Sequence, residues 1–389
     1  PARGGAPPGG PPPRSPRGPS PNHGGGGHPP LTATPTSAAL DLDTGASRGS
    51  SAAYSGTSTA SVAPRATGYE RSATVGLAVA MVVALALALS VPLDVVVFGL
   101  LAIGMVHVAL EVRYVSGHYH GLLQGRFLVG VNVVLVSIVV SRLLLPGVLP
   151  REVEILLLVG MLVATVLLAR SWRARAVGLA VLALVATFAL ARPDTWFVLQ
   201  ANLHNLLPAV FLWEWSATMV HQNRRRALRA TTVAWAVAVP VVLLSGVLDP
   251  WLATGSSAAS TAGGATVLPS LVGDPASPAA ARLLALFAFA QVMHYTVWCW
   301  FFPRHAPEAT AAFEATPVGA KLRGHRLVLL AAGVTVFVAI VAAHDYSQGR
   351  TLYTSLASYH AYLEYPVLIA LTMAWATGLG PTRRGWMEP

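Results

Sequence analysis

The chain has 389 residues, of which 54% are hydrophobic and only 11% are charged, and its mean hydropathy is +0.58. Because roughly 25% of the residues in a soluble domain are charged, this composition excludes an ordinary soluble protein and predicts an all-α, polytopic membrane protein covered by lipid. The net charge of +10 comes almost entirely from arginines near the ends of apolar segments, which favours membrane topology and no binding of nucleic acid.

Residues 1–70 are predicted to form a disordered cytoplasmic tail. The segment opens with PARGGAPPGGPPPRSPRG and continues with Ser, Thr, Ala and Gly. Such a composition buries too little apolar surface to offset the entropy lost on folding. Because the sequence begins with Pro1, we expect the natural N-terminus to lie upstream. A short second cytoplasmic tail is predicted at 379–389.

Between these tails, residues 71–378 are predicted to form a single transmembrane helical domain. A membrane-spanning helix needs about 20 predominantly apolar residues. Ten candidate spans are separated by short polar turns and prolines: 72–90, 93–113, 126–145, 153–170, 174–191, 197–220, 230–248, 280–302, 326–344 and 351–376.

The distribution of basic residues predicts the orientation of these spans. Basic residues cluster after the second, fourth, sixth, eighth and tenth spans, whereas the long segment 249–281 contains neither Lys nor Arg. Since basic loops stay in the cytoplasm, we expect a plasma-membrane protein with both termini cytoplasmic. The low-complexity segment 249–279 is predicted to be a mobile outer loop.

Ionisable side chains within the apolar spans are the main functional signal, because such groups are costly in a membrane and usually face a partner or a cavity. In the stretch IGMVHVALEVRYV, His107 and Glu111 are four residues apart and share one helix face. His360 and Glu364 repeat this spacing in the tenth span. His118, in the following SGHYHG, is predicted to lie on a solvated turn.

Four of these side chains, on different even-numbered spans, are predicted to lie at similar depth. Counted from the outer ends at 1.5 Å per residue, their positions agree within roughly 6 Å; the four are His107, Glu214, His294 and Glu364. Imidazole and carboxylate groups together suit iron, zinc, manganese or copper. The predicted metal ligands are His107, His294, His360, Glu111, Glu214 and Glu364, and the residues expected to orient them or contact substrate are His204, Asn205, Gln291 and Tyr295.

Four functions fit this pattern. We rank first an intramembrane enzyme that uses iron or another divalent transition metal to act on a lipophilic small molecule from the bilayer. A transporter or proton-coupled permease would use the same groups as a relay, and a haem protein would use two histidines as axial ligands. A structural or assembly protein would use them to hold helices together. The sequence has no Walker loop and no GxSxG, HExxH or CxxC motif to select among these.

Overall fold

The computed structural model describes residues 62–144, 150–252, 258–261, 263–277 and 279–376. Within these ranges the chain is helical and contains no strand, as predicted. The predicted tail at 1–70 lies outside the described residues except for 62–70, which form the start of α1 (Val62–Ser90). The first helix therefore begins before the predicted boundary. The predicted tail at 379–389 lies entirely outside the described residues.

Each of the ten predicted spans falls largely on helix. The first five correspond to α1, α2 (Pro92–His118), α3 (Gly125–Leu144), α4 (Arg151–Leu167) and α5 (Trp172–Ala191). The sixth is divided between α6 (Pro193–His204) and α7 (Pro208–Trp215). The seventh comprises α8 (Gln222–Val233), η2 (Ala234–Ala238) and α9 (Val239–Ser245). The eighth comprises α12 (Ala280–Thr296), η5 (Val297–Phe301) and α13 (Phe302–His305), and the last two are α16 (His325–His344) and α17 (Tyr346–Ala376).

Within the described parts of the chain, seven helices are long and apolar enough to cross a membrane. They include α1, α2, α3, α5 and α16, together with the continuous helical segments Gln222–Ser245 and Ala280–His305. The other three predicted spans are not long and apolar enough to be counted, each for a local reason. α4 has only 17 residues, the sixth span is interrupted after His204, and α17 carries many polar side chains.

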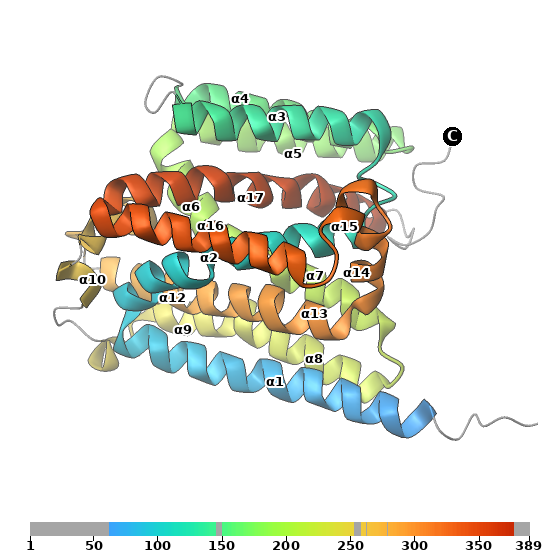
Figure 1. Ribbon diagram of the computed structural model, residues 1–389, viewed down its shortest axis with the longest axis horizontal. Helices are drawn as coiled ribbons and strands as arrows, with labels where there is room; N and C mark the ends of the chain where they lie inside the picture. Colours follow the sequence, from blue (N-terminus) through green and yellow to red (C-terminus); the bar gives the residue numbers. More distant parts are fainter. Residues whose placement is uncertain (1–61, 145–149, 253–257, 262, 278, 377–389) are drawn as a thin grey trace, which may run out of the picture. The chain divides into compact units, whose positions relative to one another are not determined.

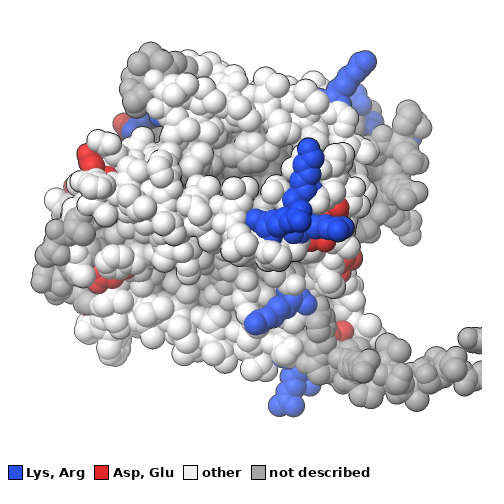
Figure 2. All heavy atoms as spheres, viewed as in Figure 1, with Lys and Arg blue, Asp and Glu red and all other residues white. Residues whose placement is uncertain are grey.

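The outward faces of several of these helices are apolar. Val129 on α3 is 62% exposed, Leu184 on α5 is 73% exposed and Leu329 on α16 is 63% exposed. Soluble monomers rarely expose so many large apolar side chains together. Figure 2 shows that uncharged residues cover most of the visible face, while Lys and Arg gather toward the end that holds α14 (Pro307–Glu314) and α15 (Pro317–Lys321).

α2 is central to the packing of the described helices. It contacts α12, α14, α16 and α17, while α3 and α4 pack on α17 and α1 packs on α12. In Figure 1, α3, α4 and α5 lie along one edge and α1, α8 and α9 along the opposite edge, with α2, α12 and α17 between them. The side chains that α2, α12 and α17 direct toward one another are therefore buried by the rest of the bundle.

A widened helical turn follows the part of α12 that faces α2. In the π-helical segment η5, the N–H of Phe302 bonds to the carbonyl of Val297, five residues earlier. The next residue is Pro303, which has no N–H and whose ring crowds the carbonyl four residues before it. The wide turn relieves this crowding, so that the helix continues past the proline. π-Helical turns of this kind are frequent at functional sites.

Short helices form in the predicted mobile outer loop. Its described part includes η3 (Asp249–Trp251), α10 (Ala258–Thr261), η4 (Gly264–Val267) and α11 (Leu268–Val272). Val267, Leu271 and Val272 are buried, and the side-chain amide of Asn202 donates a hydrogen bond to the Leu271 carbonyl at 3.0 Å. The prediction of a mobile loop is therefore wrong for 264–272, because the apolar run in this stretch packs onto the end of the bundle.

Candidate metal centre

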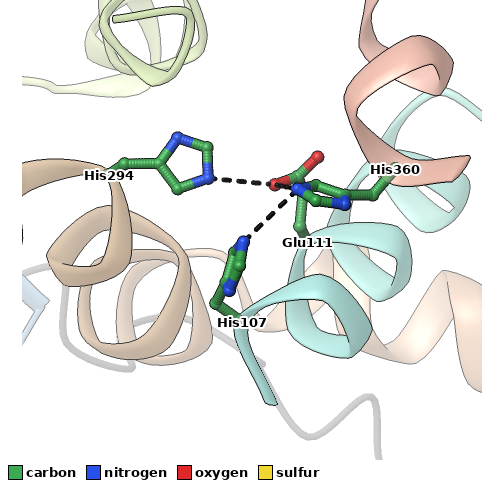
Figure 3. Close-up of side chains that lie close together, drawn as sticks. All are labelled: His107, Glu111, His294 and His360. Atoms are coloured by element: carbon green, nitrogen blue, oxygen red, sulfur yellow. Dashed lines mark hydrogen bonds and ion pairs between the residues drawn. The ribbon is translucent and has the colours of Figure 1, made fainter. Parts of the chain in front are cut away.

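Four of the predicted ligands converge from three helices (Figure 3). His107 and Glu111 come from α2, His294 from α12 and His360 from α17. Each offers one ligand atom, and these atoms all lie within 4.8 Å of one another. The exposed fractions of the four residues are 2%, 1%, 0% and 2%. Because His107 and Glu111 are four residues apart on α2, both side chains lie on one face of the helix. This face is directed toward α12 and α17, which carry the other two ligands.

The distances among these atoms suit a single metal ion. The Nε2 atoms of His107 and His360 are 3.3 Å apart. Oε2 of Glu111 lies 3.5 Å from Nε2 of His294 and 3.8 Å from Nε2 of His360. Ligand atoms in a tetrahedral site with bonds of 2.0–2.2 Å are separated by roughly 3.4 Å. Three separations therefore match closely, and any approaching 4.8 Å would have to shorten by about 1.4 Å around a tetrahedral ion.

The same atoms lack adequate partners within the protein. Nε2 of His294 and Oε2 of Glu111 have no hydrogen-bond partner among the described residues. The facing Nε2 atoms of His107 and His360 can satisfy each other only if one of them carries a proton. Buried polar atoms without partners are costly. A cation placed among the four would receive all of these lone pairs, so the chemistry of the site fits a divalent metal.

Tyr295 and Gln291, which the sequence predicted to support the site, lie beside His107. The ring of Tyr295 packs on the imidazole of His107, with 4.3 Å between centroids. The Gln291 amide donates hydrogen bonds to the Tyr295 hydroxyl at 3.0 Å and to the Val96 carbonyl at 3.4 Å. Gly99 leaves room for this amide, because a Cβ there would lie 2.9 Å from Gln291 Nε2. These contacts restrict the orientation of the His107 ring.

His204 and Glu364 form an adjoining pair outside the group of four. Nδ1 of His204 lies 2.8 Å from Oε2 of Glu364, and its ring is 4.7 Å from the His294 ring between centroids. The Glu364 carboxyl group also lies against that of Glu111. Two close carboxylates repel each other when both are ionised, so either a shared proton or a nearby cation would stabilise the pair. Asn205 is buried and bonds back to the Ala201 carbonyl at 3.2 Å.

Glu214, also a predicted ligand, is placed in a different cluster. Its carboxylate lies 3.2 Å from Nε2 of His118 and accepts a hydrogen bond from the Tyr119 hydroxyl at 3.2 Å. The depth comparison fails here because the sixth span is interrupted between His204 and Pro208, so residue counting no longer measures depth. The His118 side chain is only 14% exposed, so the prediction of a solvated turn is wrong for this residue.

A cavity of about 560 Å³ adjoins the centre. Its lining includes His107, His204 and His360 and extends to Arg350 and Arg151. The Arg151 side chain is 58% exposed, so the cavity runs from the buried histidines to the surface. A cavity of this size accommodates a small organic molecule.

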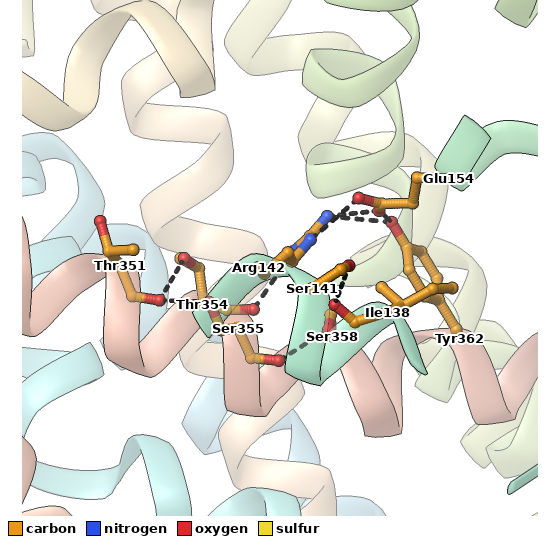
Figure 4. Close-up of polar contacts among 9 residues, drawn as sticks. All are labelled: Ile138, Ser141, Arg142, Glu154, Thr351, Thr354, Ser355, Ser358 and Tyr362. Atoms are coloured by element: carbon orange, nitrogen blue, oxygen red, sulfur yellow. Dashed lines mark hydrogen bonds and ion pairs between the residues drawn. The ribbon is translucent and has the colours of Figure 1, made fainter. Parts of the chain in front are cut away.

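Between the histidines and the surface, the cavity passes a buried charged network that the sequence reasoning missed (Figure 4). The Arg142 guanidinium donates to the Glu154 carboxylate and to the Thr354 carbonyl. The Tyr362 hydroxyl donates to the same carboxylate. The network joins α3, α4 and α17. The signal that would have revealed it is an ionisable residue within each of the third and fourth apolar segments.

No protein-family model matches the chain, and searches of curated proteins and of solved structures likewise find no match. Over its described residues the protein is all-helical, with seven helices able to span a membrane and a buried His/Glu group whose spacing suits a metal ion.

Proposed function

We propose that the protein is a multi-pass membrane metalloenzyme in which His107, Glu111, His294 and His360 hold one divalent transition metal. The observation that carries the proposal is the convergence of four buried ligand atoms, from three helices, within 4.8 Å of one another. Structural packing alone gives no reason to bury three imidazoles and a carboxylate with their lone pairs facing a common point.

Iron is the metal we favour. Imidazole nitrogen with carboxylate oxygen is the donor set of non-haem iron enzymes that react with dioxygen, and iron held by these four protein atoms could take up further ligands. The cavity reaches His107 and His360, so a substrate has access to the ion. We therefore propose an oxidoreductase that acts on a lipophilic small molecule.

The apolar outer faces of the helices support membrane insertion and entry of the substrate from the bilayer. We propose ten membrane crossings in the plasma membrane, with the arginine-rich loops and both termini in the cytoplasm. In this orientation the cavity opens on the outer side, where α11 and the first turn of α17 lie.

A transporter is the second candidate, and a specific contact favours it. The pair formed by His204 and Glu364, 2.8 Å apart, continues the ionisable cluster and adjoins the cavity. Such a series of groups can relay protons through a membrane. A relay requires no metal, so metal content separates the two candidates.

Elemental analysis of detergent-purified protein tests the proposal. We expect about one equivalent of transition metal in the wild type and its loss in His107→Ala and in His294→Ala. His325→Ala is the matched control, because His325 is exposed at the start of α16, and it is expected to keep the metal. A wild-type protein without transition metal, after purification free of chelators, would exclude the enzyme and favour the relay.

A further inference from the structure

The cavity beside the candidate metal centre is lined by both polar and apolar side chains. α17 contributes hydroxyl groups at Thr351, Thr354, Ser355 and Ser358. Neighbouring elements contribute apolar residues, among them Leu100, Phe197, Val267, Leu271 and Phe287. An amphiphilic molecule, with a polar end and an apolar body, matches such a lining better than a uniformly apolar one.

Three arginines line the cavity, and two of them are paired with a described carboxylate. Arg142 is paired with Glu154, and Arg151 is paired with Asp194. Among the described residues, Arg350 makes no ion pair. Its guanidinium donates one hydrogen bond, from Nη2 to the Ser270 hydroxyl at 2.6 Å. Arg350 therefore offers uncompensated positive charge and spare N–H donors to the cavity.

Further polar atoms of the cavity are also without partners. Oε1 of Gln200 and Oε1 of Gln291 have no hydrogen-bond partner among the described residues, and both residues line the cavity. The two residues are 7% and 1% exposed. Unpaired buried amide oxygens are costly, so these positions are suited to a bound molecule or to ordered water in the cavity.

We propose that Arg350 binds the anionic head of an amphiphilic substrate, a carboxylate or a phosphate, whose apolar body extends toward the metal centre. This inference rests on the proposed function, because it names the substrate class of that site. Guanidinium is the group best suited to carboxylate and phosphate oxygens. Ser270, on α11, accepts a hydrogen bond from the guanidinium and so holds it at the outer end of the cavity.

The position of Arg350 also predicts where on the substrate the reaction occurs. Arg350 and His360 are ten residues apart on the uninterrupted helix α17, which corresponds to about 15 Å along its axis. A substrate whose head is bound at Arg350 presents to the metal a carbon about that far from the head. Short-chain acids are too small to bridge this distance.

Binding of matched amphiphiles to the detergent-purified protein tests the inference. The probes are palmitate, the alcohol of the same chain length and the corresponding monoalkyl phosphate, with affinities measured by calorimetry. We expect the wild type to bind at least one of the two anions about 10- to 100-fold more tightly than the alcohol. The anion that binds more tightly identifies the head group.

Three variants assign the preference to Arg350. Arg350→Gln is expected to bring the anion and the alcohol to nearly equal affinity, whereas Arg350→Lys keeps most of the preference because it keeps the charge. Arg192→Gln is the control, because it removes an exposed arginine that does not line the cavity, and it should behave as the wild type. Equal affinities for anion and alcohol in the wild type would overturn the inference, as would an unchanged preference in Arg350→Gln.

The metal content of the same samples separates this inference from the proposed function. A metal-containing wild type without anion preference contradicts the inference alone. A metal-free wild type that still prefers anions through Arg350 contradicts the enzyme, and leaves an anion-binding cavity that fits the transporter.

Discussion

At the scale of single residues, the predicted carboxylate ligands have different roles. Glu111 faces the three histidines of the centre, with Oε2 3.5 Å from His294 Nε2. Glu364 lies behind it, against His204 at 2.8 Å. Glu214 is bound to His118 and Tyr119 and contributes nothing to the group of four. From the sequence, all three carboxylates are predicted to be metal ligands.

Metal affinity should therefore respond differently to two isosteric changes. Glu364→Gln removes a charge that acts through Glu111 and His204, and we expect it to weaken metal binding by about 10- to 100-fold, as is usual for groups that hold ligands in place. Glu214→Gln should leave metal affinity unchanged. Competition with a chromophoric chelator measures both. Equal losses in the two variants would contradict the placement of Glu214 outside the centre.

At the scale of helices, the sequence predicted the elements well because long apolar runs and prolines mark them directly. Pro92 and Pro208 begin α2 and α7 as the first helical residues. It also predicted similar depth for His107, His294 and Glu364, whose spans are continuous at those points. It failed for Glu214, where the helix is interrupted. The sequence could not identify Arg350 as unpaired, because the pairing of an arginine depends on which acidic residues of other helices pack beside it.

Close approach of α2 to α14 depends on one glycine. A Cβ at Gly117 would lie 1.9 Å from the Ala309 carbonyl oxygen, a backbone atom that cannot move independently of its helix. We expect Gly117→Ala to destabilise the protein by about 1–3 kcal/mol, the usual cost of overpacking, measured as a lower midpoint of thermal unfolding in detergent.

Gly130→Ala is the matched control for this change. A Cβ at Gly130, on α3, meets nothing within 4 Å, so the substitution should be neutral or stabilise the helix by up to about 1 kcal/mol. If the two alanine variants unfold at the same temperature, the close crossing of α2 and α14 is not present.

At the scale of the whole molecule, the proposed orientation follows from charge. The basic residues at the end with α14 and α15 (Figure 2) include Lys321, Arg323 and Arg326, all of them exposed. Acidic Asp274 is exposed within the segment 249–281, which has no basic residue. An asymmetry of this kind predicts that the two ends lie on opposite sides of the membrane.

Labelling with a membrane-impermeant thiol reagent tests this orientation. In a Cys299→Ser background, Asp274→Cys should react in intact cells, whereas Arg226→Cys, in the exposed arginine run that begins α8, should react only after the membrane is permeabilised. Labelling of both positions in intact cells would contradict an arginine-rich cytoplasmic side.

We propose that three imidazoles and one carboxylate hold a metal ion between α2, α12 and α17. X-ray absorption at the metal edge of the purified protein tests this arrangement. We expect nitrogen and oxygen neighbours at about 2.0–2.2 Å, with an imidazole contribution that falls in His360→Ala. A sulfur shell near 2.3 Å, or a spectrum unchanged in that variant, would show that any bound metal is held elsewhere.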